Sequence, residues 1–461
     1  MPKTFPAGES QLLIDDTWIA DGTKVGRVFH QARKYPDPIL VADKPWERFC
    51  PVIYGTVLDA GDRLRIWYKT RTFDSVHKIC YAESVDGITW EKPDLGLIEY
   101  EGSKDNNISI QHPEGIMIDG VGIIEDPEDA EWPFKAVFWQ AGPKRGMCVI
   151  RSKDGLAWDW NPGLVLPDWG DRNNCMSRKD NGKYVILGRS PGLTKKYGVR
   201  IVARTESEDL VHWSEPTLIL KPDTEDDAGL QFYSAVAFRY ESLYLGFIER
   251  MHVCPDLLDT ELIYSHDGWD WRRTRPRPRF IEWGSPRRWD DTWLFVGTNA
   301  PIRRTGQLWF YYSGRSSAHG AAYPENHGAL GLALLRTDGF ASMQAKEKEG
   351  WIETPPMRWP GGDLEVNVDC RRDLTQHYST CSGELRVEVR GPSGRTLKGY
   401  SAEDCAIVRR NTASRKLGSD SHVPVFWQDG KRSMNRHQGK AVRLVFHMRD
   451  AHLYSFRARQ E

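Results

Sequence analysis

A short string in the middle of the chain has the spacing of a nucleophilic serine. Gly188-Arg-Ser190-Pro191-Gly192 matches G-x-S-x-G, in which a sharp strand-to-helix turn presents the serine hydroxyl. That arrangement needs the backbone N–H of the residue after the serine as an oxyanion donor, and Pro191 has no N–H. No helical pattern is evident after the string. We therefore predict no serine-based ester hydrolysis here.

Metal and redox chemistry have little support in the sequence. The nearest two of the eight cysteines, Cys370 and Cys381, are eleven positions apart, so no CxxC motif exists. His319, Glu325 and His327 form a polar loop, but two histidines without a third ligand are a weak pattern for a metal site. We predict neither a metal nor a cofactor.

Carboxylates are the stronger candidates for chemistry. Glu249, in Phe247-Ile-Glu249-Arg250, ends a strongly apolar run beside His252. Burial at the end of such a strand raises the pKa of a carboxylic acid, which suits a general acid. The alternative is that Glu249 pairs with Arg250 at the rim.

Length and charge restrict the class of protein. A chain of 461 residues is long for one domain, so two domains are expected. Its 63 basic and 64 acidic residues give a net charge of −1, which argues against the basic surface of a nucleic-acid binder. No run of about eighteen apolar residues is present, so we expect no membrane span. The first residues show no secretion signal and the cysteines are dispersed, which together favour a cytoplasmic protein.

The elements that must position the candidate side chains are predicted to be strands and turns. Tryptophan is unusually frequent, with 19 residues against 17 tyrosines and 16 phenylalanines, beside 41 glycines and 27 prolines. This composition is typical of all-β proteins with many turns, since Gly and Pro supply turn conformations. Indole rings also favour the faces of sugar rings.

One turn motif recurs at intervals of 68, 55, 58 and 71 residues, counted between its aspartates. Asp caps a tight turn through the backbone, Gly takes positive φ, and Trp begins the next strand. Each copy follows an alternating, strand-like run, so units of roughly sixty residues and about four strands match propeller blades. We expect these turns to be scaffold. The copies are Ser84-Val-Asp86-Gly87-Ile-Thr-Trp90, residues 152–158, 207–213 and 265–271, and a degenerate fifth, Thr337-Asp-Gly-Phe340.

A second pattern begins near residue 350. Apolar residues alternate with polar ones at 364–368, 385–389 and 442–448. Antiparallel strands with one buried face predict a β-sandwich. We therefore expect an all-β protein, with a five-bladed β-propeller over residues 1–348 as the catalytic domain and an accessory β-sandwich over 349–461.

Five such units followed by a β-sandwich resemble the five-bladed propeller glycosidases of families 32, 43 and 130. The chain is most similar to a bacterial group of fructosidase-like proteins, through Leu12-Leu-Ile-Asp15-Asp16-Thr-Trp-Ile19, Trp90–Gly96 and Leu453-Tyr-Ser-Phe456. The resemblance covers most of the chain. The fructosidase strings W-M-N-D-P-N-G, R-D-P and E-C-P are missing, so the resemblance implies the architecture and leaves the sugar open.

The resemblance implies carboxylate chemistry. A glycosidase uses one carboxylate as nucleophile or base and a second, of raised pKa, as acid. In the resembled families the first is an aspartate on the opening strand, which is the place of Asp15 and Asp16. Their alternative role is to tie the closure of the propeller. The family pattern adds an aspartate from a middle blade and a glutamate from a later one, the places of Asp171 and Glu249.

Three function classes follow from this resemblance. A glycoside hydrolase acting on a small glycoside or oligosaccharide in the central funnel is favoured. The alternatives are a glycoside phosphorylase, with Arg71, Arg189 or Arg200 holding phosphate, and a non-catalytic carbohydrate-binding propeller. The expected partner is a small carbohydrate, with no nucleic acid or membrane, and a homo-oligomer is compatible with the sequence. Substrate contacts are expected from Trp46, Glu47, Arg71, His252 and His319.

Overall fold

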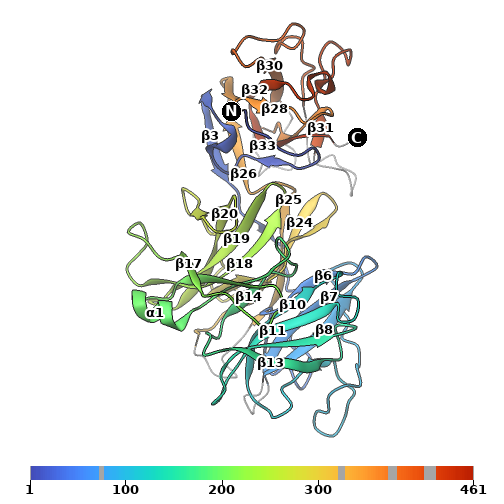
Figure 1. Cartoon of the computed structure of the whole chain (residues 1–461), viewed down its shortest axis with the longest axis vertical. Helices are drawn as coiled ribbons and strands as arrows, with labels where there is room; N and C mark the ends of the chain where they lie inside the picture. The colour runs from blue at the N-terminus through green and yellow to red at the C-terminus, as the bar shows by residue number, and fades with distance from the viewer. Residues whose placement is uncertain (1, 72–76, 320–327, 372–381, 410–421, 460–461) are drawn as a thin grey trace. The chain divides into compact units, whose positions relative to one another are not determined.

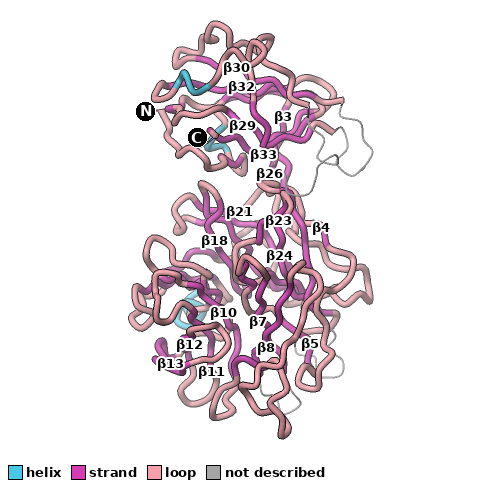
Figure 2. Tube along the Cα trace, turned by 90° about the vertical axis from the view of Figure 1, so that its right-hand side faces the viewer, coloured by secondary structure: helices cyan, strands magenta, loops and turns pink. Residues whose placement is uncertain are grey.

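The computed structural model describes residues 2–71, 77–319, 328–371, 382–409 and 422–459. The chain forms two compact units (Figures 1 and 2). Unit 1 comprises Met1–Gln31, Arg303–Leu308 and Leu335–Glu461, and unit 2 comprises Ala32–Ile302 and Trp309–Leu334. Among the described residues no helix is both long and apolar enough to cross a bilayer.

Within the described residues, the strands of unit 2 fall into five antiparallel groups of four principal strands each, and one parallel pairing, Leu258 with Trp293, joins the fourth and fifth groups into a single nine-stranded sheet. The first contains β5 (Phe49–Val52), β7 (Leu64–Arg71), β8 (His77–Ser84) and β9 (Ile108–Ile110), and β6 (Val57–Asp59) also pairs with β7. The second contains β10 (Ile118–Glu125), β11 (Phe134–Gln140), β12 (Gly146–Ser152) and β13 (Asp159–Pro167). The third contains β14 (Asn173–Cys175), β15 (Tyr184–Gly188), β16 (Val202–Ser207) and β17 (Thr217–Leu220). The fourth contains β18 (Leu230–Tyr240), β19 (Leu243–His252), β20 (Leu257–Ser265) and β21 (Trp271–Arg273). The fifth contains β22 (Trp293–Val296), β24 (Gln307–Arg315), β25 (Gly328–Arg336) and β4 (Arg33–Lys34), and β23 (Ile302–Arg304) also pairs with β24.

Hydrogen bonds link the first blade to both of its neighbours in the ring, the second and the fifth. The backbone N–H of Ile123 in the second sheet donates to Thr56 Oγ1 of the first over 2.9 Å. The ring closes where Thr298 N, after β22, donates to Gly55 O of the first sheet over 3.1 Å. Strand β4 enters from the N-terminal side and pairs with β25 as the outermost strand of the fifth sheet. Unit 2 is therefore a five-bladed β-propeller whose last blade is completed by an early segment of the chain.

The repeated turn joins the third strand to the fourth in four blades. In the first copy, Asp86 Oδ1 accepts from the backbone N–H groups of Ile88 and Thr89 at 2.8 and 2.7 Å, and Gly87 has φ +77°. The carbonyl of Gly87 accepts from the Tyr311 hydroxyl of the neighbouring fifth blade at 3.0 Å. The same internal bonds recur around Asp154, Asp209 and Asp267, so the predicted capping by Asp is confirmed. The prediction that Trp begins the next strand holds only in the fourth copy, at Trp271.

The degenerate fifth copy is not a blade turn. Residues 337–340 follow β25 and lead to β26 (Ala341–Ala345), which belongs to unit 1. Because β4 already supplies the fourth strand of the fifth blade, no turn from β25 to a fourth strand is required. Asp338 instead accepts from the Ser455 hydroxyl at 2.6 Å.

Unit 1 is a β-sandwich whose two sheets share one apolar core. Phe446 of one sheet and Phe456 of the other both lie in this core, with ring centroids 5.6 Å apart. One sheet has the order β3 (Val25–Phe29), β26, β33 (Ala451–Ala458), β29 (Leu364–Asp369) and β31 (His422–Pro424), with β1 (Gln11–Leu12) on β33. The other contains β2 (Asp21–Thr23), β27 (Gly350–Glu353), β32 (Ala441–Arg449) and β28 (Met357–Arg358), with β30 (Glu384–Arg390) on β32.

The predicted architecture of propeller and sandwich is confirmed, but the boundary at residue 348 was wrong. The first 31 residues and residues 335–348 belong to the sandwich unit. Leu13 and Trp18 are buried in the core of unit 1, and β1 pairs with β33 at the other end of the chain. Burial of these apolar side chains against the C-terminal strands decides the assignment.

Candidate functional site at the centre of the propeller

The blade topology brings side chains from the first four blades to one end of the ring. In an antiparallel blade, the start of the first strand and the loop between the second and third strands lie at the same end. First strands surround the propeller axis, so residues far apart in sequence converge there. We call the resulting group the central cluster. It comprises Tyr54, Lys69, Asp119, Asp171, Arg172, Arg189, Tyr233 and Glu249.

Two cations lie close to the Tyr54 ring. Lys69 Nζ is 4.4 Å from the ring centroid, and the guanidinium carbon of Arg172 is 4.1 Å from it. The same ring stacks on Phe295 with centroids 4.6 Å apart. A tyrosine face attracts cations, so Tyr54 holds Lys69 and Arg172 in place while keeping both apart from bulk water.

Arg172 and Glu249 form a buried ion pair. Both guanidinium Nε and Nη2 donate to the carboxylate, with Nε 3.2 Å from Oε2. Glu249 has no exposed surface, and Arg172 is 2% exposed. The expected alternative partner, Arg250, points to the other face of β19 and pairs with Asp259 and Glu261. A carboxylate held in this way is positioned to orient Arg172.

Asp119 and Asp171 are the more accessible carboxylates of the cluster. Their side chains are 21% and 48% exposed. They begin neighbouring first strands, and a Cβ added at Gly120, which has φ +63°, would lie 3.2 Å from the Asp171 carbonyl oxygen. Glycine at position 120 therefore allows the two strands to approach closely enough to present both carboxylates at one end of the ring.

Asp119 is ionised by its neighbours. Burial acts to raise its pKa, but Lys69, whose Nζ is 2.7 Å from Oδ1, and His77 together lower the pKa below the usual aspartate range. Burial also lowers the pKa of Lys69, with the charges of Arg315 and Arg172 acting in the same direction. An ionised carboxylate with a depressed pKa can act as a nucleophile or a base, and is unsuited to act as an acid.

A second set of contacts lies around Tyr233. Arg189 pairs with Asp171, and its guanidinium carbon is 5.2 Å from the Tyr233 ring centroid. The Tyr233 hydroxyl is 3.2 Å from His319 Nε2, and the His319 ring stacks on Trp293 at 4.7 Å. These contacts join the third, fourth and fifth blades and offer polar donors beside an aromatic surface.

Asp15 and Asp16 are not on a propeller strand, so this part of the prediction was wrong. Both lie in unit 1, where Asp15 caps a short 3₁₀ helix, Asp16–Trp18, and accepts from Thr17 N at 2.9 Å. Asp16 pairs with Arg27 at 2.6 Å and its side chain is 78% exposed. The local sequence forms a cap and a surface ion pair, which explains both aspartates structurally.

The five residues predicted to contact a substrate lie in different parts of the propeller. Trp46 and Glu47 are buried in the first blade, where Trp46 Nε1 donates to Asn107 and Glu47 pairs with Lys92 at 2.7 Å. His252 shares the face of Arg250, since alternate residues point the same way, and lies 3.2 Å from Asp259. His319 contacts the central cluster through Tyr233. Arg71 ends β7, and its side chain lies outside the described part of the structure, as do Glu325 and His327.

Sequence reasoning missed five of the eight residues of the central cluster: Tyr54, Lys69, Asp119, Arg172 and Tyr233. Only Asp119-Gly120 carried a local signal, because an acidic residue followed by glycine after the 108–110 strand resembles a strand-opening bulge. The prediction that no helix follows Gly188 was also wrong. Helix α1 (Pro191–Tyr197) begins there, with Ser190 as N-cap and Gly198 in the left-handed conformation at its end. The sequence signal for this helix was a serine directly before a proline, with a glycine seven positions after that proline.

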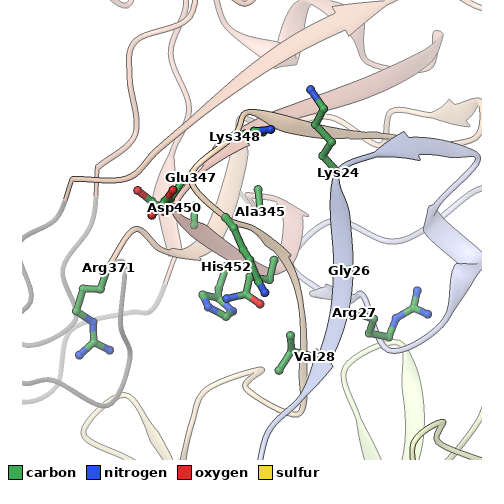
Figure 3. A pocket seen from close by; sticks show the side chains of 13 residues that line it. Lys24, Gly26, Arg27, Val28, Ala345, Glu347, Lys348, Arg371, Asp450 and His452 are labelled. Carbon is green, nitrogen blue, oxygen red and sulfur yellow. The ribbon is translucent and has the colours of Figure 1, made fainter.

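Unit 1 contains a separate cavity of about 920 Å³ (Figure 3). It lies on one sheet, where Gly26, Gln344 and His452 form a row across β3, β26 and β33. Exposed lysines and the ion-paired Arg27 and Arg371 complete much of its lining. The lining includes none of the residues predicted for chemistry. Among the described residues, no group of three His, Cys, Asp or Glu side chains is arranged to hold a metal ion.

Fold and cluster together define a five-bladed β-propeller protein with a β-sandwich unit and a charged, aromatic centre. No protein-family model and no curated protein matches the sequence.

The chain is similar to a β-1,2-mannobiose phosphorylase from Listeria innocua (13% identity, TM-score 0.49, covering 67% of this chain and 97% of that one). It is also similar to an α-L-arabinofuranosidase from Podospora anserina (11%, 0.48, 67% and 98%). A third structure is an N-acetylgalactosamine deacetylase from F. plautii (16%, 0.44, 74% and 95%). At these identities and TM-scores the structures carry no argument about the reaction. The predicted architecture of the propeller glycosidases is confirmed by the strand topology itself.

Proposed function

We propose that the protein cleaves the glycosidic bond of a small glycoside or oligosaccharide at the central cluster, by carboxylate chemistry. The observation that carries this proposal is the pair of accessible carboxylates, Asp119 and Asp171, on neighbouring first strands at the axis. Glycoside hydrolysis needs two carboxylates that flank one bond. The other buried charges around them, paired and fixed, suit a preorganised site.

The two aspartates take different roles because their surroundings differ. Asp119, held ionised by Lys69, acts as nucleophile or base. Asp171, the more exposed carboxylate, takes the role of the acid once the substrate occupies its ion-pair partner Arg189. Glu249 has no exposed surface and serves instead to position Arg172. The exposed ring of His319, which stacks on the buried Trp293 and contacts the Tyr233 hydroxyl, supplies the ring surface that a sugar would contact.

The decisive experiment compares the wild type with Asp119→Asn on a panel of aryl glycosides and oligosaccharides. We expect the substitution to lower turnover at least about 10²-fold, as loss of an acid–base or nucleophilic carboxylate does. Asp16→Asn is the matched control, since it removes a carboxylate of unit 1 that was also a candidate, and should leave turnover unchanged.

Thermal unfolding must show that Asp119→Asn remains folded, because it leaves Lys69 without its carboxylate partner. Full turnover in a folded Asp119→Asn protein would overturn the assignment. A wild-type protein that binds sugars but cleaves none of the panel would instead identify a carbohydrate-binding propeller without activity.

A further inference from the structure

A serine hydroxyl joins two histidines inside unit 1. Ser342 Oγ lies 2.8 Å from Nε2 of His30 and 2.9 Å from Nδ1 of His452. Ser342 has no exposed surface and His452 is 5% exposed, whereas His30 is half-buried. The centroids of the two imidazole rings are 5.8 Å apart. We call these three residues the histidine bridge.

The histidine bridge connects two strands that are separated by a third. His30 directly follows β3, Ser342 belongs to β26 and His452 belongs to β33, in a sheet where β26 lies between the other two strands. Among the described residues, β3 is the edge of that sheet and pairs with β26. The bridge therefore adds a side-chain connection that holds the N-terminal strand to the sheet beyond its ladder to β26.

The histidine bridge requires that the two imidazole rings are not both protonated. A hydroxyl has one hydrogen, so Ser342 donates to one ring nitrogen and accepts from the other. The ring that accepts this hydrogen bond has an unprotonated nitrogen and is therefore neutral. If both rings were protonated, both nitrogens beside Ser342 would be donors, and its hydrogen would have no acceptor on either ring. Two like charges would also lie side by side in a largely buried place, which is unfavourable.

A carboxylate and two guanidinium groups lie beside the histidine bridge. Asp369 is opposite His452 in the strand register, and it pairs with Arg336 at 3.2 Å and with Arg371 at 2.7 Å. The guanidinium carbon of Arg336 is also 4.1 Å from the ring centroid of Tyr454, a ring that packs against both histidines. Asp369 is thus shared by two arginines, which limits the counter-charge that it offers to an imidazolium.

Both histidines are therefore neutral near pH 7. Burial lowers the pKa of His30 to about 4, with the charges of His452 and Arg336 acting in the same direction and Asp369 opposing them. Burial also lowers the pKa of His452 to about 4, against Asp369 and together with Arg336 and Arg371. An unfolded chain has histidines of pKa about 6.5, so the native state binds fewer protons than an opened one. The stabilisation is fully present above about pH 6.5 and is lost as pH falls towards 4.

The cavity of unit 1 gives protons access to the histidine bridge. His452 is part of the wall of this cavity, which has a volume of about 920 Å³ (Figure 3). Protons therefore reach the bridge without prior opening of the sheet. The same wall carries titratable side chains of both signs: Lys24, Lys346, Lys348, Glu347 and Asp450.

We propose that the histidine bridge is an acid-sensitive latch, which holds β3 on the sandwich sheet near neutral pH and releases it when both histidines are protonated. Release breaks the ladder between Val25–Phe29 and Ala341–Ala345. Within the described residues this is the one ladder of β3, whereas β26 and β33 each have at least two partner strands. Detachment of β3 is therefore the least costly way to separate the two rings. The latch lies in unit 1 and does not depend on the reaction at the propeller.

The test measures amide hydrogen exchange of the full chain by mass spectrometry between pH 7 and pH 5, corrected for the intrinsic effect of pH on exchange. Each histidine that gains its proton only on opening raises the opening equilibrium by up to about 10-fold per pH unit in this range. We expect peptides from Val25–Phe29 and Ala341–Ala345 to lose at least about 10-fold in protection. Peptides from β30, in the other sheet, should keep theirs.

Three variants separate the latch from general stability. The double variant His30→Asn, His452→Gln removes both titrating rings and should abolish the pH dependence of protection in β3. Ser342→Ala keeps the rings but removes the hydroxyl, and should lower protection of β3 about 10-fold already at pH 7. His212→Asn, which replaces an exposed histidine of the third blade, is the matched control and should change neither.

A titration of the wild type decides the question even if the double variant does not fold. The imidazole proton signals of His30 and His452, followed by NMR, should titrate below pH 6 and together with the loss of protection in β3. Titration of both rings near pH 6.5 would overturn the latch. Protection of β3 that does not change with pH, or that falls equally in both sheets, would also overturn it, as would a pH dependence that persists in the folded double variant.

Discussion

Four blades carry the same turn between their third and fourth strands, whereas the side chains at the centre of the ring differ in every blade. The turn around Asp154 and the one around Asp267 have the same two backbone hydrogen bonds to the carboxylate. At the centre, by contrast, the first blade contributes Tyr54, the second Asp119 and the third Arg172. Repetition thus belongs to the part that builds each blade, and variation belongs to the part that meets the axis.

The repeated turns also fasten each blade to its neighbour. Trp67 Nε1 of the first blade donates to the Gly155 carbonyl of the second at 2.8 Å, and Arg204 of the third donates to Gly268 of the fourth at 2.7 Å. In the third blade Leu210 replaces the glycine and keeps φ at +65°; its side chain is buried, which offsets the strained conformation. The comparison shows that an acidic motif repeated along the chain can be entirely structural, whereas the acids of the central cluster each occur singly.

The largest loss of stability is expected when the buried ion pair at the centre of the propeller is disrupted. Glu249→Gln should lower the free energy of unfolding by about 3 kcal/mol, because it leaves the buried Arg172 guanidinium without its counter-charge. Chemical denaturation measures the loss. The double variant Arg172→Met, Glu249→Leu is the control, and should lose less than the single variant since no unpaired charge remains. A Glu249→Gln protein within about 0.5 kcal/mol of the wild type would show that the pair does not act as described.

A smaller loss of stability is expected when the repeated turn of the first blade is disrupted. Asp86→Ala removes the acceptor of two backbone N–H groups and should cost about 1 kcal/mol of unfolding free energy, with turnover per folded molecule unchanged. Asp62→Ala, an exposed acid of the hairpin between β6 and β7, is the matched control and should cost less. If folded Asp86→Ala lost its activity or sugar binding, the division between structural turns and functional centre would be wrong.

The smallest effect is a pH dependence of the same turns. Backbone N–H groups of Trp269 and Asp270 lower the pKa of Asp267, so the native state binds its proton less readily than the unfolded chain. The stabilisation is therefore fully present above about pH 4, the unfolded pKa, and is lost as pH falls through the lower native value. Asp267→Asn should be less stable than the wild type by about 0.5 kcal/mol at pH 7, and this difference should shrink towards pH 2. A difference that stays constant from pH 7 to pH 2 would show that the charge of Asp267 contributes nothing.

The sequence by itself determined the all-β fold, the blade repeat and the sandwich. These depend on local chemistry: Asp86 caps residues two and three positions away, and alternating apolar residues such as Val387 and Val389 define one buried face. The cytoplasmic location and the oligomeric state stay predictions. Of the predicted site residues, Asp171, Glu249 and His319 do lie in or against the central cluster.

Only the tertiary structure decided which charges meet. Lys69 and Asp119 are paired across two blades, and Arg172 and Glu249 across two others, because closing the ring brings the second strand of one blade against the first strand of another, between residues 50 and 77 positions apart in the chain. The same holds for the N-terminal segment. Asp15 and Asp16 follow a strand whose partner, β33, lies at the opposite end of the sequence, with Gln11 opposite Phe456. Local patterns hold no information about such distant pairings, since these form where the buried apolar area is largest once both ends are present.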